Sequence, residues 1–211
     1  MKSVLISIQP YWVFLIIARL MGWDVPHEKT IEVRKSFPRG SAWSKKTLIY
    51  CSKSMRSFKR IPVQYQPFMK QLLGKVIGEF VCDDIDQIAV FGRQLYCEKN
   101  TQADKLSQMC LTIDEVIDYL GEKNRGFDWH ISDLKIYDES KELQEFYKPV
   151  KYDSDGPICG TEQELSDICE WDCETVFHKK QTECTLAECP KLQGLYRMTR
   201  PPQSWCYVEE I

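Results

Sequence analysis

The chain has 211 residues, of which 43% are hydrophobic, 12% aromatic and 28% charged. This composition is typical of a globular protein and excludes an intrinsically disordered chain. The net charge of −3 conceals an uneven distribution, because residues 29–75 contain twelve Lys or Arg and one acid, Glu32, for a total of +11. The remainder has 16 basic and 30 acidic residues, or −14. Such separation is typical of phosphate recognition, and a solvated basic face balanced by acidic neighbours is the alternative.

Residues 1–22 are expected to form neither a secretory signal nor a membrane span. Pro10 and Arg19 interrupt the apolar run, and no small-residue cleavage site follows it. We therefore expect a cytoplasmic protein with no membrane partner. In a reducing compartment, clustered cysteines favour thiolates or a metal site over a disulfide framework.

The N-terminal third predicts strands around one main helix. A buried strand over Val4–Ile8 ends at Gln9-Pro10, and Pro10 suits the first turn of a mostly buried helix over Tyr11–Met21. The fillers of Lys29-Thr30-Ile31-Glu32-Val33-Arg34 favour a strand, in which Glu32 and Arg34 share a face. From spacing alone, the favoured interpretation of this stretch is an exposed strand edge that carries an ordinary surface ion pair.

Further strands are expected over Thr47–Cys51, Gly74–Asp83, Trp129–Tyr137 and Trp205–Val208. The glycines of the Gly74–Asp83 strand predict a bend or a close backbone approach. A capping box at Thr112–Glu115 predicts a short helix that ends at Gly121. The segment 84–107 is ambiguous and suggests a strand and a loop, and 140–146 suggests a short helix or turn. The order of strands favours an α+β fold, a small mixed β-barrel with flanking helices, over a doubly wound sheet.

This order of elements resembles the ASCH domain, a member of the PUA-like β-barrel superfamily. The resemblance rests on Ile8-Gln9-Pro10 before an apolar helix, on Leu48–Cys51 and Gly74–Glu79, and on the family pattern G-x-K-x-x-E-x-R. Lys29, Glu32 and Arg34 match that pattern, whereas His27 stands at the glycine position. The resemblance covers residues 2–146, with Trp205–Val208 as the closing strand, and the Cys-rich insertion resembles that of long members found in prophages and Firmicutes. We therefore expect a barrel over 1–150, a Cys-rich acidic insertion over 151–198 and a closing strand within 199–211.

The resemblance implies a cleft that holds RNA, a single-stranded nucleic acid or a nucleotide. Lys29 and Arg34 would meet phosphate, and Glu32 would accept from a base amino group. Trp12 or Trp205 would supply a stacking face. Lys35 completes the candidate ligand-binding set.

Two alternatives to binding stay open. Small members of the family hydrolyse N4-acylated cytidine with a lysine, a hydroxyl residue three positions on and a glutamate, and ribonuclease activity has been proposed for others. Lys29 matches that lysine, Glu32 stands where the hydroxyl would be, and Glu79 is the loosely aligned glutamate. In such an enzyme Glu79 would act as general base and Lys29 would polarise the acyl oxygen. The other alternative is a phage-type protein that sequesters a nucleotide or binds a protein partner.

The acidic segment near the C-terminus carries five of the ten cysteines. Cys169-x3-Cys173 followed by Cys184-x4-Cys189 fits a loose four-cysteine zinc site, with Cys159 or His178 as a replacement ligand. Because tighter C-x2-C pairs are usual in zinc sites, buried or free thiols remain the alternative. Four protein ligands would leave no open position, so zinc would be structural.

Overall fold

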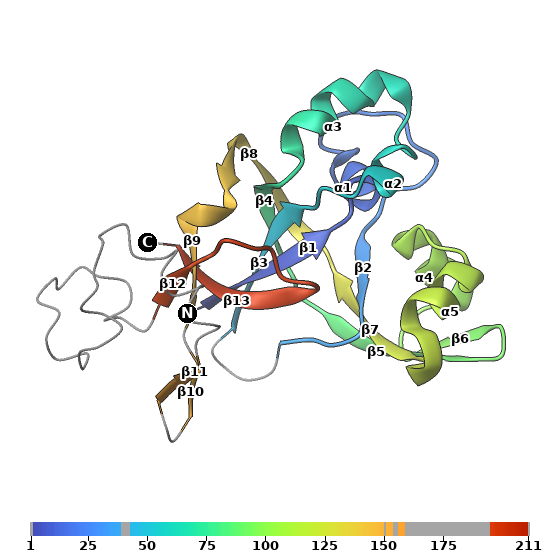
Figure 1. Ribbon diagram of the computed structural model, residues 1–211. Coiled ribbons are helices and arrows are strands. Elements are labelled where there is room, and N and C mark those ends of the chain that lie inside the picture. Colours follow the sequence, from blue (N-terminus) through green and yellow to red (C-terminus); the bar gives the residue numbers. More distant parts are fainter. Residues whose placement is uncertain (1, 39–42, 150, 154–155, 159–194, 211) are drawn as a thin grey trace, which may run out of the picture.

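The computed structural model describes residues 2–38, 43–149, 151–153, 156–158 and 195–210 and has an α+β fold (Figure 1). The largest sheet has seven strands in the order β12-β9-β13-β1-β3-β4-β8. Its strands are β1 (Lys2–Ile8), β3 (Trp43–Cys51), β4 (Lys75–Val81), β8 (Ser132–Glu142), β9 (Phe146–Pro149), β12 (Leu195–Arg197) and β13 (Trp205–Glu210). All of its pairings are antiparallel except β1 with β3, so the sheet is mixed, as expected.

A second sheet is antiparallel and follows the order β2-β7-β5-β6. Its strands are β2 (Ile31–Arg34), β5 (Ile85–Phe91), β6 (Gln94–Cys97) and β7 (Arg125–His130). A short hairpin pairs β10 (Lys151–Asp153) with β11 (Gly156–Ile158). The pairing of β2 with β7 in this sheet fixes the position of the charged stretch.

Five α-helices and three 3-10 turns complete the described part of the chain. The helices are α1 (Pro10–Ile17), α2 (Met55–Phe58), α3 (Gln66–Leu72), α4 (Gln102–Met109) and α5 (Ile113–Leu120). The 3-10 turns are η1 (Val63–Tyr65), η2 (Gly121–Lys123) and η3 (Leu143–Glu145). In Figure 1, α1, α2 and α3 lie at one end of the large sheet, and α4 and α5 lie beside the small one. The helices therefore approach β2 from two sides.

The helix α1 starts at Pro10, as predicted, and is buried almost all round, with Val13 through Ile17 inside the core. One core lies where α1 and α3 pack on β1, β3 and β4, and a second covers the other face of these strands. A third core joins α4 and α5 to the small sheet through Ile31 and Val33 of β2. The apolar side chains of β2 thus point into this core, and the charged ones point away from it.

Several expected elements are confirmed, among them the strands that are now β1, β2, β3, β4 and β13. The helix α5 begins with the predicted capping box, since Thr112 and Glu115 bond each other's backbone N–H groups. The expected strand over Trp129–Tyr137 is instead divided between two strands, β7 and β8, which are separated at Ile131, and Asp133 within β8 has a φ of 44°. The ambiguous segment 84–107 forms β5, β6 and part of α4, and 140–146 holds the end of β8 and η3.

Candidate functional site

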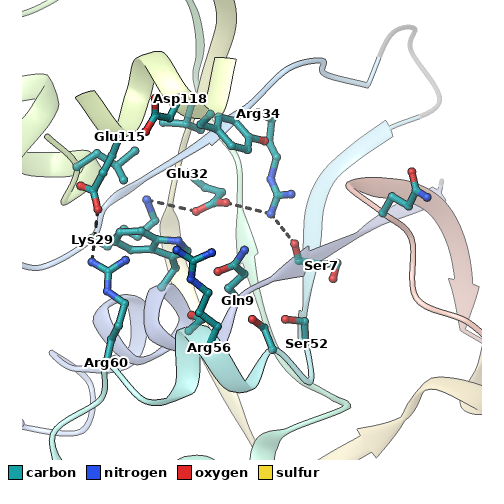
Figure 2. Close-up of a pocket in the computed structure, with 17 residues that line it drawn as sticks. Ser7, Gln9, Lys29, Glu32, Arg34, Ser52, Arg56, Arg60, Glu115 and Asp118 are labelled. Carbon is teal, nitrogen blue, oxygen red and sulfur yellow. Dashed lines mark hydrogen bonds and ion pairs between the residues drawn. The ribbon is translucent and has the colours of Figure 1, made fainter. Parts of the chain in front are cut away.

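A cavity of about 610 Å³ lies between α1 and α2 on one side and α5 on the other, with β2 behind it (Figure 2). Trp12, Lys29, Glu32 and Arg34, four of the predicted ligand-binding residues, line it. The structure therefore brings the charged stretch of the sequence to the wall of a cavity that is large enough for a small organic ligand.

The carboxylate of Glu32 holds two cations in a row along this wall. Its Oε2 lies 3.3 Å from Lys29 Nζ, and its Oε1 lies 3.0 Å from Arg34 Nη2. All three residues are buried, with exposed fractions of 4–6%. The exposed ion pair that spacing alone allowed is thus excluded, because these charged groups are buried. Each is neutralised by its ion-pair partner rather than by water.

The ammonium group of Lys29 is held by acceptors within the protein. Besides its ion pair with Glu32, Nζ donates to the carbonyl of Ile31 at 2.7 Å and to that of Met109 at 2.8 Å. An ammonium has three N–H donors, and these two hydrogen bonds use two of them. The Met109 carbonyl ends α4, where a cation is favourable. Lys29 therefore ties α4 to the charged stretch.

Arg34 keeps unused donor capacity. Its Nη2 donates to the carbonyl of Ser7 at 2.7 Å as well as to Glu32, whereas its buried Nε has no hydrogen-bond partner among the described residues. Tyr119 of α5 lines the same cavity. Burial raises the pKa of Tyr119, and the charge of Arg34 offsets part of that effect. Tyr119 stays protonated at neutral pH and can donate to a ligand.

The wall formed by α2 presents two more arginines, as Figure 2 shows below Glu32. Arg60 lies over the rings of Tyr11 and Trp12, with its Cζ 4.0 Å and 4.9 Å from their centroids. Its Nη2 is also 3.5 Å from Glu115 Oε1. Arg56 is exposed and makes no hydrogen bond or ion pair within the described part of the chain. Ser52 adds a buried hydroxyl that finds no partner among the described residues.

The opposite wall is acidic and comes from α5. Glu115 and Asp118 lie above Arg60 and Arg56 in Figure 2. The capping box fixes the first turn of α5, and Val116 and Leu120 anchor the helix in the core. The cavity is therefore polarised, with guanidinium donors on one wall and carboxylate acceptors on the other.

Three predicted site residues lie outside the cavity lining. Glu79 is on β4, where it pairs with Lys46 at 2.9 Å and accepts from the Tyr137 hydroxyl at 2.8 Å. Trp205 donates from its indole nitrogen to Ser36 Oγ at 3.0 Å. Lys35 lies with its Nζ 5.4 Å from the centre of the Tyr119 ring. The structure thus brings Lys29 and Glu32 together but does not bring Glu79 to them.

Sequence reasoning missed most of the residues that line this cavity, among them Arg56, Arg60, Glu115, Asp118 and Tyr119. Arg56 and Arg60 were recognisable only as part of a basic segment. The α5 residues were recognisable only as the polar side of an amphipathic helix. Their common position depends on the packing of α5 against β2, which no local pattern encodes.

The expected zinc ligands Cys169, Cys173, Cys184 and Cys189, with Cys159 and His178, lie outside the described residues, so the zinc site stays a prediction. Within the described residues, no group of three or more His, Cys, Asp or Glu is placed to hold a metal ion. Nor does that part of the chain include a helix of the length and apolarity needed to cross a membrane.

Three crystal structures from Zymomonas mobilis are similar to this chain. The ASCH protein of that organism matches with a TM-score of 0.44 and 17% identity, covering 99% of this chain and 88% of its own. One point mutant of it matches with a TM-score of 0.44 and 15% identity, covering 99% and 89%. A second matches with a TM-score of 0.41 and 17% identity, covering 68% and 77%. No protein-family model and no curated protein matches the sequence.

Proposed function

We propose that this protein binds a nucleotide, or one nucleotide unit of a nucleic acid, in the cavity beside β2. The observation that carries the proposal is the placement of Arg34, Arg56 and Arg60 in one cavity opposite Glu115 and Asp118. Guanidinium groups match phosphate oxygens as planar forks, and carboxylates accept from base amino groups. A ligand with an anionic end and a hydrogen-bonding ring fits both walls.

The proposal assigns different tasks to the arginines. Arg56 and Arg60, with Ser52, meet the phosphate because they form the outer wall. Arg34 meets the sugar or the phosphate from the inside, held at its angle by Glu32 and Ser7. Lys29 and Glu32 support this arrangement rather than contact the ligand, since Lys29 Nζ is held by two backbone carbonyls and by its ion pair with Glu32. Trp12 or Tyr119 contributes a ring beside the base.

The geometry favours binding over the hydrolytic alternative. Amide hydrolysis requires a carboxylate that is free to act as a base beside the lysine. Glu32 is held between two cations, and Glu79 pairs with Lys46 outside the cavity lining. The proposal is therefore a binding function without turnover.

The test is the affinity of the purified protein for nucleoside monophosphates and short RNA, measured by calorimetry and fluorescence anisotropy. Arg56→Ala should weaken binding about 10–100-fold, because a charge-assisted hydrogen bond contributes about 1.5–3 kcal/mol. Lys70→Ala is the matched control, since Lys70 is an exposed cation on α3 that does not line the cavity. If no nucleotide or RNA binds, or if both variants bind like the parent, the proposal is wrong. Release of product from N4-acetylcytidine would instead support the enzyme.

A further inference from the structure

A second hollow of about 550 Å³ lies next to the cavity, and we call it the groove. It is lined by Lys35, Gln87, Phe91, Lys123, Asn124, Arg125 and Phe127. Three of these residues are cations, and none of the described residues that line the groove is acidic. In a chain of net charge −3, such a groove is a local concentration of positive charge.

The cations of the groove are available to a ligand. Lys35, Lys123 and Arg125 are all exposed. Lys123 and Arg125 make no ion pair within the described part of the chain, and Lys35 contacts only the Tyr119 ring there. Nothing in the fold needs these charges, because β7 is held by its neighbours β2 and β5. Their positions favour a polyanionic partner.

Aromatic rings accompany these charges. Phe91, at the end of β5, is 59% exposed, which is unusual for a phenylalanine. It makes an edge contact with Tyr96, which is 51% exposed. Phe127 forms another part of the lining and packs against Phe37. Proteins hold unpaired bases with this arrangement of cations between exposed rings. The faces of unpaired bases are free to stack on the rings, whereas those of a duplex are not.

The groove adjoins the cavity where Lys35 contacts Tyr119. Arg34 lines the cavity, and Lys35, the next residue, lines the groove. Tyr119 lines the cavity and contacts Lys35, with 5.4 Å between Nζ and the ring centre. We infer that the ligand is a single-stranded nucleic acid that runs from the cavity into the groove. Its phosphates would meet Lys35, Lys123 and Arg125, and a base would stack on Phe91. This inference rests on the proposed function of the cavity.

The experiment compares a nucleoside monophosphate with single-stranded RNA and DNA of about eight nucleotides and with a duplex of the same sequence. Lys123→Ala/Arg125→Ala should weaken strand binding about 10–100-fold and leave mononucleotide binding unchanged. The slope of log K against log salt for the strand should become shallower by about 1.4–2, since two phosphate contacts are lost. Phe91→Ala should weaken strand binding at any salt concentration. Lys70→Ala/Lys135→Ala removes two exposed cations outside both hollows and is the matched control.

The outcomes separate the two proposals. If Arg56→Ala weakens both ligands and the groove variants weaken neither, the cavity binds a nucleotide and the inference about the groove is wrong. If the groove variants weaken strand binding and Arg56→Ala does not, the strand binds in the groove alone; the proposed function of the cavity then fails, and so does the continuous path. If a poly-glutamate peptide competes as well as the strand and Phe91→Ala has no effect, the groove accepts any polyanion, which overturns a nucleic-acid site. Equal affinity for the duplex would do the same.

Discussion

Lys105 is a buried cation that holds α4 against the small sheet. Only 4% of its surface is exposed, and its Nζ lies 3.2 Å from Asp86 Oδ2 and 2.5 Å from Asp128 Oδ2. Asp128 Oδ1 also accepts from the backbone N–H of Asp86. Burial lowers the pKa of Lys105, but the hydrogen bonds and charges of the two aspartates outweigh it, and the net pKa is raised. The ammonium is therefore the stable form at neutral pH.

Replacing Lys105 by Met should destabilise the protein by about 3–5 kcal/mol, because two buried carboxylates would lose their counter-ion. Urea unfolding at pH 7 measures this change. Because the folded pKa is raised, the contribution is complete below the ordinary lysine pKa of 10.5 and is lost only as pH rises through the folded value. Lys99→Met is the control, since Lys99 bonds Asp84 and Asp86 from an exposed position and should matter much less. Equal effects of both variants would contradict this account.

At the scale of single residues, sequence reasoning reached part of the site. It predicted that Glu32 and Arg34 share one face of a strand, and both line the cavity. It could not show that backbone carbonyls hold Lys29, because one of them is the carbonyl of Met109, 80 residues away. It could not place Glu79 either. A carboxylate within an apolar strand indicates that some cation or donor must lie beside it, but the sequence does not show that this partner is Lys46.

Among the elements, β7 supports both β2 and α5, whose residues line the cavity. Gly126 of β7 sets how closely β2 and α5 approach it. A Cβ at Gly126 would lie 2.6 Å from Leu120 Cδ2 of α5 and 2.9 Å from the carbonyl oxygen of Arg34. Only a residue without a side chain allows β2 and α5 to pack at this distance on β7. The position of Arg34 in the cavity therefore depends on Gly126.

Gly126→Ala should lower the free energy of unfolding by about 1–3 kcal/mol, the usual cost of overpacking. It should also weaken nucleotide binding, because β2 must shift and carries Arg34 with it. Urea unfolding and calorimetry check the two effects. Ser107→Ala, at an exposed position of α4, should change neither. An unchanged stability of Gly126→Ala would show that the neighbours relax around the methyl group.

Elements with strong local signals were predicted well, and those that depend on distant partners were not. The capping box predicted α5, and the alternation of Ile31 and Val33 with charges predicted β2. Within the ambiguous segment 84–107, a strand was expected but the pair β5 and β6 was not resolved, because each is short and β6 has only four residues. They owe their stability to pairing with each other and to β7, which is a tertiary effect.

Across the whole molecule, some cations of the basic segment 29–75 line the cavity and others form ion pairs outside it. Four of its cations, Lys29, Arg34, Arg56 and Arg60, line the cavity. Others form ion pairs with acids elsewhere, such as Lys46 with Glu79 and Lys75 with Glu142. The uneven charge of the sequence thus predicted the basic wall of the cavity. It did not predict that other cations of the segment are neutralised by ion pairs outside the cavity.

Buried thiols should make the whole protein sensitive to alkali. Burial raises the pKa of Cys51 and Cys82 to about 12 and that of Cys206 to about 11, from 9.0. Above pH 9 the unfolded chain binds fewer protons at these thiols than the folded one, so stability falls as pH rises. Each of Cys51 and Cys82 should account for about 1 kcal/mol at pH 10. Urea unfolding from pH 7 to 10 measures the slope.

Cys51→Ala/Cys82→Ala should flatten this slope, and Cys97→Ser should flatten it less. The pKa of Cys97 is also raised by burial, but its side chain is partly exposed. A slope that does not change in the double variant would assign the loss of stability to other groups. Such an outcome would contradict the role given to the buried thiols.

The pairing of β1 with β13 has a consequence for how the protein folds. These strands stand near opposite ends of the described chain, yet Leu5 pairs with Cys206. Both ends contribute to the cavity, through Ser7 and Gln203. Contacts between residues so far apart in sequence slow folding. The conformational entropy of closing a loop of most of the chain must be lost before such contacts can form and stabilise the protein. On a ribosome, the cavity would stay incomplete until almost the whole described chain had emerged, and ligand binding could begin only then.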